Sequence, residues 1–225
     1  MLKYETHLHT SPVSKCAKAS VRESLEFYKK AGYAGVFITN HFIDGNGDNS
    51  KTYEEQIRYY FSDYEEGKSL EKEIGIRVFS GVEMTYKGTD FLVYGPDKAW
   101  YLLHPEIMDM LQHEKLRFLM EQGALVIQAH PFREASFIKY FRLFPYFVQG
   151  VEIINASNKE LANQMAKQYA EGYNLIPFAG SDNHRAGEQK MLAGMESEAE
   201  VLSERDFVQK VLNGEMRVFC QENIW

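Results

Sequence analysis

Two histidines near the start of the sequence, His7 and His9, have the spacing of a metal chelate. They come after a short run, residues 2–6, that is typical of a β-strand. If the strand continues through them, they point to the same face, as residues i and i+2 of a strand do. The two imidazoles would therefore point to one place, and neutral imidazole is a common ligand for zinc, iron and manganese. Because a His-x-His pair also arises by chance, it predicts a metal site only if further ligands reach the same place.

Further candidate ligands follow apolar runs that have the pattern of buried strands. These runs cover residues 34–39, 76–82, 124–129, 150–154 and 175–179. The polar residues at their ends are His41, Glu83, His130, Asn155, Asp182 and His184. Because the runs alternate with amphipathic segments, they predict a parallel α/β sheet, in which the loops after the strands share one face. So many nitrogen and oxygen ligands exceed the three or four of one catalytic zinc, so we expect two or three metals, with Glu83 or Asp182 bridging.

Each of these residues also has a plain structural explanation when it is considered alone. A histidine after a strand is commonly a hydrogen-bonded loop residue, Asp182 suits a helix N-cap or a turn, and Glu83 suits an ion pair. All of these explanations would have to hold together to dismiss the site, so we favour the metal centre.

The segments between the strands have helical signals. Ser20 and Glu23 form a capping box before a helix that ends at Gly32. Further helices are predicted at residues 52–72, 105–121, 136–144, 158–171 and 204–212. Residues 89–94 are predicted to form a strand, paired as a hairpin with residues 84–86, and residues 216–219 form a last apolar run.

The composition predicts an ordinary soluble globular protein. The length of 225 residues suits one domain, residues 1–225, and the net charge of −7 disfavours stable nucleic-acid binding. Cys16 and Cys220 lie far apart and suggest free thiols in a reducing compartment. The sequence shows no signal peptide and no apolar run of membrane-spanning length, so we expect a cytoplasmic protein; the oligomeric state is left open.

Five short motifs, in order, resemble those of the PHP-domain family, the polymerase and histidinol phosphatase family. They are HLHT at residues 7–10, ITNH ending at His41, GVE ending at Glu83, QAHPF around His130 and SDNH at residues 181–184. The resemblance implies a distorted (β/α)7, TIM-like barrel with a di- or trinuclear centre of zinc, manganese or iron. It also implies that the protein is a metal-dependent phosphoesterase that hydrolyses phosphate esters.

The resemblance further implies which residues hold each metal. His7, His9, Glu83 and Asp182 would bind the first metal, and Glu83 would bridge to a second that His130 also binds. His41 and His184 would bind a third.

The sequence departs from the family at two of its ligand positions. Many members have a histidine or aspartate several residues after the His-x-His pair, where this chain offers only Cys16, either a thiolate ligand or a small loop or core residue. Many members also have a histidine where this chain has Asn155.

The predicted catalytic residues are Glu83, His130, Asp182 and His184, since metals held there would activate water, and His130 or His184 could protonate the leaving oxygen. The expected partner is a small phosphorylated substrate, such as histidinol phosphate or a sugar, nucleoside or amino-alcohol phosphate. The cations predicted to bind its phosphoryl group are Arg133, Arg185 and Lys15, with Lys18 as a further candidate. Residues 44–49 and 136–147 are the segments expected to set specificity.

Two other functions are compatible with the same residues. Amidohydrolase barrels use similar strand-end histidines for C–N hydrolysis, but they commonly have a carbamylated lysine where this chain has Glu83. A non-catalytic regulatory module is the other alternative, and the intact set of histidines and carboxylates argues against it.

Overall fold

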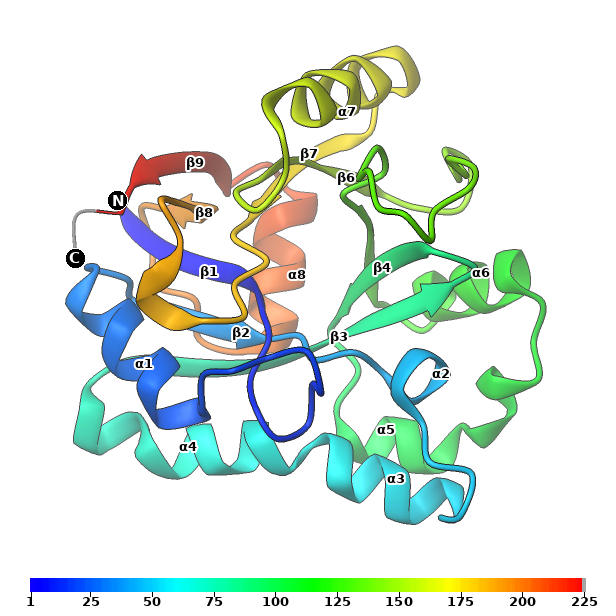
Figure 1. Cartoon of the computed structure of the whole chain (residues 1–225), viewed down its shortest axis with the longest axis horizontal. Coiled ribbons are helices and arrows are strands. Elements are labelled where there is room, and N and C mark those ends of the chain that lie inside the picture. Colours follow the sequence, from blue (N-terminus) through cyan, green and yellow to red (C-terminus); the bar gives the residue numbers. More distant parts are fainter. Residues whose placement is uncertain (224–225) are drawn as a thin grey trace.

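The predicted strands that end in candidate ligands lie side by side in one curved sheet (Figure 1). The computed structural model of the protein describes residues 1–223, so the last two residues of the predicted domain lie outside it. The strand order is β7-β6-β5-β4-β3-β2-β1-β8-β9. The strands are Leu2–Leu8 (β1), Gly35–Ile38 (β2), Arg77–Tyr86 (β3), Thr89–Tyr94 (β4), Leu125–Ala129 (β5), Gly150–Asn155 (β6), Ile176–Gly180 (β7), Met191–Ser197 (β8) and Arg217–Glu222 (β9).

Strands β1 to β7 form a nearly closed barrel. The pairs β1–β2, β2–β3, β5–β6 and β6–β7 are parallel. Just after β7, Asn183 pairs with the end of β1: its N–H donates to His7 O at 3.3 Å, and its carbonyl accepts from His9 N–H at 3.0 Å. These bonds bring the two ends of the barrel together, which confirms the expected distorted TIM-like barrel.

The distortion lies mainly in β4, which runs antiparallel to both of its neighbours. The predicted hairpin with β3 is therefore confirmed, but the site end of β4 is its first residue and not its last. Strands β8 and β9 extend the sheet antiparallel from β1, outside the barrel. The sequence pattern indicated β9 in part and missed β8.

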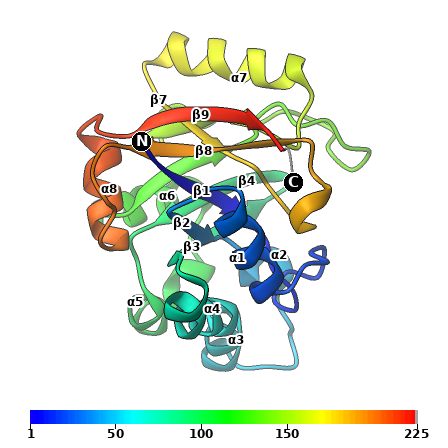
Figure 2. The ribbon, with the colours of Figure 1, turned by 90° about the vertical axis from the view of Figure 1, so that its left-hand side faces the viewer.

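Helices cover the outside of the barrel. In Figures 1 and 2, α7 lies at one end of the molecule, and α3, α4 and α5 lie at the opposite end. No helix within residues 1–223 is long and apolar enough to cross a membrane. The α-helices are Val21–Lys30 (α1), Ile43–Asn46 (α2), Tyr53–Tyr60 (α3), Ser62–Ile74 (α4), Lys98–Leu103 (α5), Gln112–Glu121 (α6), Glu160–Tyr173 (α7) and Glu204–Leu212 (α8).

Several helix predictions need correction. The capping box of Ser20 and Glu23 is present at the start of α1. The predicted helix at 52–72 is two helices that meet at Phe61, and the one at 105–121 is a 3-10 turn, Pro105–Met108, followed by α6.

The predicted helix at 136–144 is wrong because a buried side chain takes its backbone partners. Gln128 of β5 donates from Nε2 to Arg142 O at 2.7 Å and accepts from Phe144 N–H at 3.1 Å. These bonds hold the segment in an irregular path against the barrel.

An aromatic layer closes the barrel below the strand ends. Phe37 stacks on Phe79 with 4.8 Å between ring centroids, and Phe207 of α8 lies 4.2 Å from Phe37. Tyr94 of β4 packs against Phe207 and donates its hydroxyl to Thr6 O at 2.6 Å. All of these rings are buried, so solvent reaches the strand ends only from the opposite side.

One buried acid inside the barrel makes stability depend on pH. Glu5 of β1 accepts hydrogen bonds from His7 N–H and Ser181 N–H, while its Oε2 has no hydrogen-bond partner within residues 1–223. Burial raises the pKa of Glu5 from 4.5 to about 7. The protonated form is therefore favoured in the folded state, and the stability it contributes is lost as the pH rises through about 7.

We therefore expect Glu5→Gln to stabilise the metal-free protein at pH 8, by on the order of 2 kcal/mol. The gain should shrink towards zero near pH 4.5, where wild-type Glu5 is protonated in the folded state and increasingly so in the unfolded state. Urea unfolding of both proteins at pH 8 and pH 5 measures the difference. An equal difference at both pH values would show that Glu5 acts through packing and not through its charge.

Candidate metal centre

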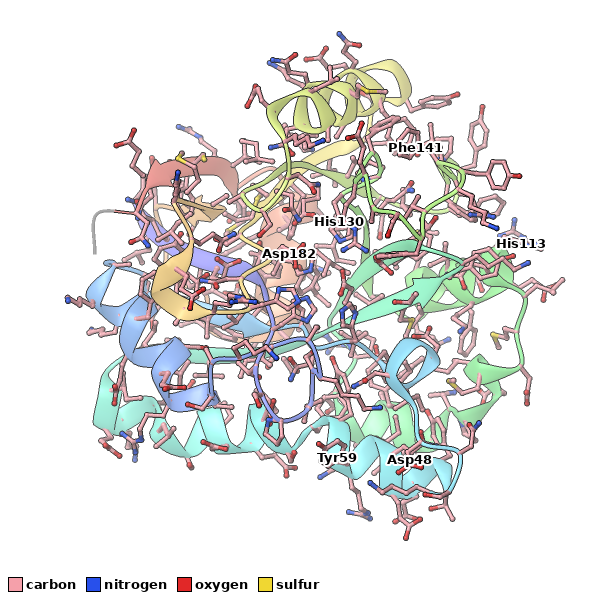
Figure 3. The ribbon with its side chains drawn as sticks, in the orientation of Figure 1. Asp48, Tyr59, His113, His130, Phe141 and Asp182 are labelled. Atoms are coloured by element: carbon pink, nitrogen blue, oxygen red, sulfur yellow. The ribbon has the colours of Figure 1, made fainter. Side chains whose placement is uncertain are left out.

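The seven predicted ligands converge at the open end of the barrel, and Figure 3 shows two of them, His130 and Asp182, near its middle. The group is buried except for two histidines at its mouth, His41 and His184, whose side chains are 26% and 25% exposed. The ligands come from β1, β3 and the loops after β1, β2, β5 and β7. The parallel strand ends thus place them together, as the sequence pattern predicted.

Glu83 of β3 lies at the middle of four imidazoles. Its Oε1 is 3.1 Å from His7 Nε2 and 3.2 Å from His130 Nε2. Its Oε2 is 2.8 Å from His41 Nδ1 and 3.3 Å from His9 Nε2. A carboxylate with one oxygen directed at each pair of imidazoles has the arrangement of a ligand that bridges two cations.

Asp182 faces three imidazoles from the loop after β7. Its Oδ1 is 3.6 Å from His7 Nε2, 3.5 Å from His9 Nε2 and 3.5 Å from His184 Nδ1. Asp182 has φ of 54° and His130 has φ of 25°, a region that non-glycine residues rarely adopt. Such backbone conformations cluster at functional sites, where they direct a side chain that regular structure would point elsewhere.

Two residues that the sequence did not single out orient the histidines from behind. Glu152 of β6 is fully buried and its Oε1 is 2.9 Å from His7 Nδ1, while its Oε2 accepts from His130 N–H at 3.0 Å. Ser14 Oγ is 3.1 Å from His9 Nδ1. Hydrogen bonds at Nδ1 leave Nε2 free to bind a metal and fix the plane of each ring. The sequence signal that could have revealed Glu152 is an acidic residue within the otherwise apolar run of β6.

A third unpredicted residue, Asp90, reaches the centre as the second residue of β4. Its Oδ2 is 3.8 Å from His130 Nε2 and 3.3 Å from Arg133 Nη2. Asp90 escaped the search for residues at the ends of strands because β4 is antiparallel, so its beginning lies at the site.

Asn155 has a different role from the histidine that the family resemblance would place there. Its Nδ2 donates to Glu152 Oε2 at 2.9 Å and to Asp182 Oδ2 at 3.2 Å. An amide that donates to two carboxylates presents no oxygen to a cation at those positions, so Asn155 holds the acids in place.

The predicted phosphate-binding cations lie at different distances from the centre. Arg133 is partly buried and contacts Asp90, whereas Arg185 is exposed and pairs with Glu188 at 3.2 Å. Lys15 is exposed and lines a pocket that also includes His41. Lys18 contributes its backbone N–H to His184 O at 2.7 Å. Arg133 is therefore the cation best placed to reach a bound phosphoryl group.

The charged groups of the metal-free centre strongly shift one another's pKa. Burial opposes ionisation of Glu83, but the positive charges of His41 and His7 hold its pKa well below the usual value. Burial lowers the pKa of His41, but Glu83 and Cys16 outweigh it and raise the pKa to about 11. Burial and the neighbouring His184 lower the pKa of His9 to about 3. Without a metal cation, protons on some of the histidines therefore offset the negative charge of the buried carboxylates.

These residues fit divalent cations. Glu83 Oε2 is buried and makes no hydrogen bond with the residues that the structure describes, although two ring nitrogens lie within 3.3 Å of it. His7 Nε2 and His9 Nε2 are only 3.2 Å apart, so at most one of these two nitrogens can carry a hydrogen that points at the other. Imidazoles and carboxylates are ligands of zinc, manganese and iron, and a cation here would satisfy this oxygen and both nitrogens.

Cation binding is expected to release protons near pH 7.5. His41 is protonated in the metal-free protein because its pKa is about 11, and a ring nitrogen must lose its proton before it binds a metal. Affinity should therefore rise with pH. Calorimetric titration with zinc in two buffers of different ionisation enthalpy measures the protons released, and equal heats in both buffers would contradict the expectation.

Comparison with known proteins supports the resemblance to the PHP family. No protein-family model matches the chain. An uncharacterized protein of Methanocaldococcus jannaschii is 28% identical over 176 residues, which cover 73% of this chain and 89% of that one.

Among solved structures, a two-domain protein from Bacteroides vulgatus that contains a predicted PHP-like metal-dependent phosphoesterase is similar with a TM-score of 0.66 and 15% identity. The match covers 97% of this chain but only 64% of that protein. PsfC from Pseudomonas syringae has a TM-score of 0.60 at 16% identity, with 98% and 91% of the two chains covered. An amidohydrolase from Chromobacterium violaceum, solved with bound sulfate and no metal, has a TM-score of 0.56 at 13% identity, with 96% and 97% covered. At these identities the likeness shows a shared fold, one that includes PHP-like and amidohydrolase proteins.

Proposed function

We propose that this protein is a metal-dependent phosphoesterase that hydrolyses a small phosphomonoester. The observation that supports the proposal most directly is the position of Glu83, with one carboxylate oxygen facing His7 and His130 and the other facing His9 and His41. When bound there, divalent cations would supply an acidified water as nucleophile and neutralise phosphoryl charge.

The chain's own residues prepare this chemistry. Glu83 and Asp182 would provide the negative charge that holds the cations, and His130 and His184 would be among the imidazole ligands. Glu152 and Asn155 fix the ligand geometry through hydrogen bonds. Because His130 Nε2 faces Glu83 at 3.2 Å, we assign it as a ligand and not as the proton donor to the leaving oxygen.

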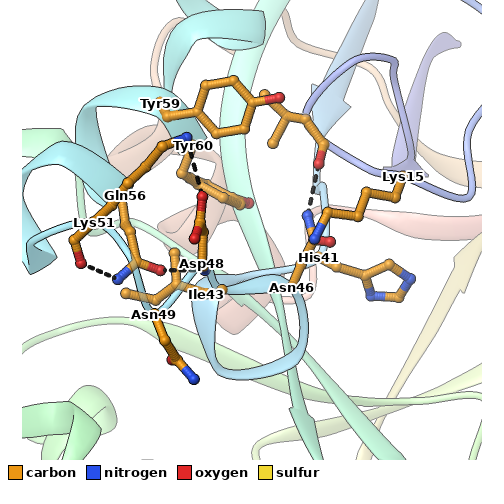
Figure 4. Close-up of a pocket in the computed structure, with 12 residues that line it drawn as sticks. Lys15, His41, Ile43, Asn46, Asp48, Asn49, Lys51, Gln56, Tyr59 and Tyr60 are labelled. Carbon is orange, nitrogen blue, oxygen red and sulfur yellow. Dashed lines mark hydrogen bonds and ion pairs between the residues drawn. The ribbon is translucent and has the colours of Figure 1, made fainter.

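A pocket beside the centre offers room for the leaving group of the ester. It has a volume of about 370 Å³, and four of its twelve lining residues belong to the segment that was expected to set specificity, residues 44–49 (Figure 4). His41 and Lys15 lie on one side of this pocket, and Lys51 and Gln56 lie on the other. These polar walls suit a hydrophilic leaving group that hydrogen-bonds, such as a sugar or an amino alcohol.

The test combines metal analysis with a substrate panel. Purified protein, reconstituted with zinc or manganese, is assayed against sugar, nucleoside and amino-alcohol monophosphates, and against amides and cyclic C–N substrates. We expect bound metal and release of inorganic phosphate. Hydrolysis of only the C–N substrates would favour an amidohydrolase, and a protein that binds no metal and hydrolyses no substrate after reconstitution would refute the proposal.

A further inference from the structure

The outer end of the metal centre contains a cysteine among three histidines. The ligand atoms of Cys16, His9, His41 and His184 all lie within 4.8 Å of one another. Cys16 lies on the loop between β1 and α1, and its side chain is exposed at the mouth of the barrel, so it is not a packing residue of the core. The two histidines nearest the solvent come from the loops after β2 and β7.

The loop that carries Cys16 is fixed to those histidines by backbone hydrogen bonds. Lys18 N–H and Ala19 N–H both donate to His184 O, at 2.7 and 3.3 Å. On the other side, Ser14 Oγ accepts from His41 N–H at 3.0 Å. Cys16 lies between these anchors, so the fold itself holds the thiol beside both imidazoles.

A separate observation indicates that this cluster binds a ligand. Glu83 Oε2 points to its inner side, 2.8 Å from His41 Nδ1 and 3.3 Å from His9 Nε2. The Glu83 side chain is 1% exposed, and this oxygen makes no hydrogen bond with any residue from 1 to 223. In the metal-free protein the charge of His41 offsets part of the cost of burying this oxygen, and a metal cation between the oxygen and the ring nitrogens would replace that proton.

We propose that Cys16 is a thiolate ligand, with His41 and His184, of a cation at the outer end of the centre. Thiolate and imidazole together favour zinc and other thiophilic divalent cations over magnesium or calcium. The inner end differs, since Glu83, Asp182 and Asp90 surround His7 and His130 there with oxygen ligands. The two ends should therefore differ in metal preference, which makes the outer site the one that selects a soft metal. This inference rests on the metal centre of the proposed function but not on phosphate chemistry.

The second cysteine of the chain provides a matched control. Cys220 lies in β9, outside the barrel, and is also exposed and free of disulfide bonding. In a Cys220→Ser protein, Cys16 is the one remaining thiol, and in a Cys16→Ser protein the reverse holds.

Cobalt titration of these variants tests the proposal. Cys220→Ser should show the intense near-ultraviolet absorption of a cobalt–thiolate bond, and Cys16→Ser should lack it and bind about one equivalent less metal. Zinc should slow alkylation of Cys16 in Cys220→Ser by at least about tenfold, because a metal-bound thiolate is shielded, and leave alkylation of Cys220 in Cys16→Ser unchanged. Circular dichroism verifies folding, and Cys16→Asp, which can retain a cation without the absorption band, provides a second variant if Cys16→Ser unfolds.

The outcomes separate this inference from the proposed function. Three results would overturn the role of Cys16 and leave the inner centre intact: cobalt binding to Cys220→Ser without a thiolate band, equal metal content in Cys16→Ser and Cys220→Ser, or an alkylation rate of Cys16 that zinc does not change. A protein that binds no metal in any variant would overturn both.

Discussion

Glu83→Gln is expected to lower kcat by about a thousandfold or more, equivalent to about 4 kcal/mol of activation free energy, and to remove bound metal. The glutamine amide has nearly the shape of the carboxylate but no charge, and an NH2 group, which can only donate hydrogen bonds, replaces one of the two oxygens. Four imidazole nitrogens lie within 3.3 Å of the two carboxylate oxygens, so the change affects both ends of the centre at once. The barrel should remain folded, because the removed charge is also a buried one.

Metal content, steady-state kinetics and near-ultraviolet circular dichroism together measure this effect. Glu54→Gln is the control, since Glu54 is an exposed glutamate of α3 that pairs with Arg58 and does not line the pocket beside the centre. Full metal content with unchanged kcat in Glu83→Gln would show that Glu83 is not a bridging ligand. Loss of the folded signal would instead indicate that Glu83 is needed for the barrel.

Much of this centre followed from one rule about parallel sheets. Polar residues at the ends of several predicted strands share a face once the strands are parallel. The rule needed only the strand positions, which buried apolar runs show clearly, and it placed His7, His41, Glu83, His130 and Asp182 together. The nearly closed barrel brings them within hydrogen-bond distance of one another.

The rule failed where the sheet departs from it. Asp90 stands at the start of β4, and only the antiparallel direction of that strand brings it to the centre. Glu152 lies inside β6, where the strand pattern predicts an apolar residue, and Ser14 comes from an irregular loop. Asp90 and Glu152 contact histidines distant in sequence, and Ser14 reaches His9, five residues away, only through the path of its loop. The roles of all three depend on pairings or loop geometry that local patterns do not contain.

The aromatic segment after β5 shows the same limit for the fold. Its composition suggested a helix at residues 136–144, yet Gln128 satisfies the backbone at Arg142 and Phe144. A buried amide on a neighbouring strand thus outweighs local helix preference. The irregular path places Phe137 beside Arg133, at 5.7 Å from the ring centroid to the guanidinium carbon.

Arg133→Met is expected to lower kcat/KM for a phosphomonoester by about 100-fold while bound metal stays unchanged. Arg133 Nη2 contacts Asp90 beside His130, and its Nε is buried with no hydrogen-bond partner among residues 1–223. A guanidinium held in this way has donors available for phosphoryl oxygens above the centre. Arg133→Lys should retain part of the activity, because an ammonium keeps the charge but not the fork of donors.

The matched control is Arg142→Met, since Arg142 belongs to the same segment but donates to Lys87 O at the surface. A structural role for Arg133 would consist of neutralising Asp90, whose burial raises its pKa and disfavours its charge. In that case Arg133→Lys should retain full activity, because an ammonium also neutralises Asp90. If Arg133 binds the phosphoryl group, Arg133→Lys should retain only part of the activity, and inorganic phosphate should inhibit Arg133→Met more weakly than wild type, since the phosphate lacks its cation.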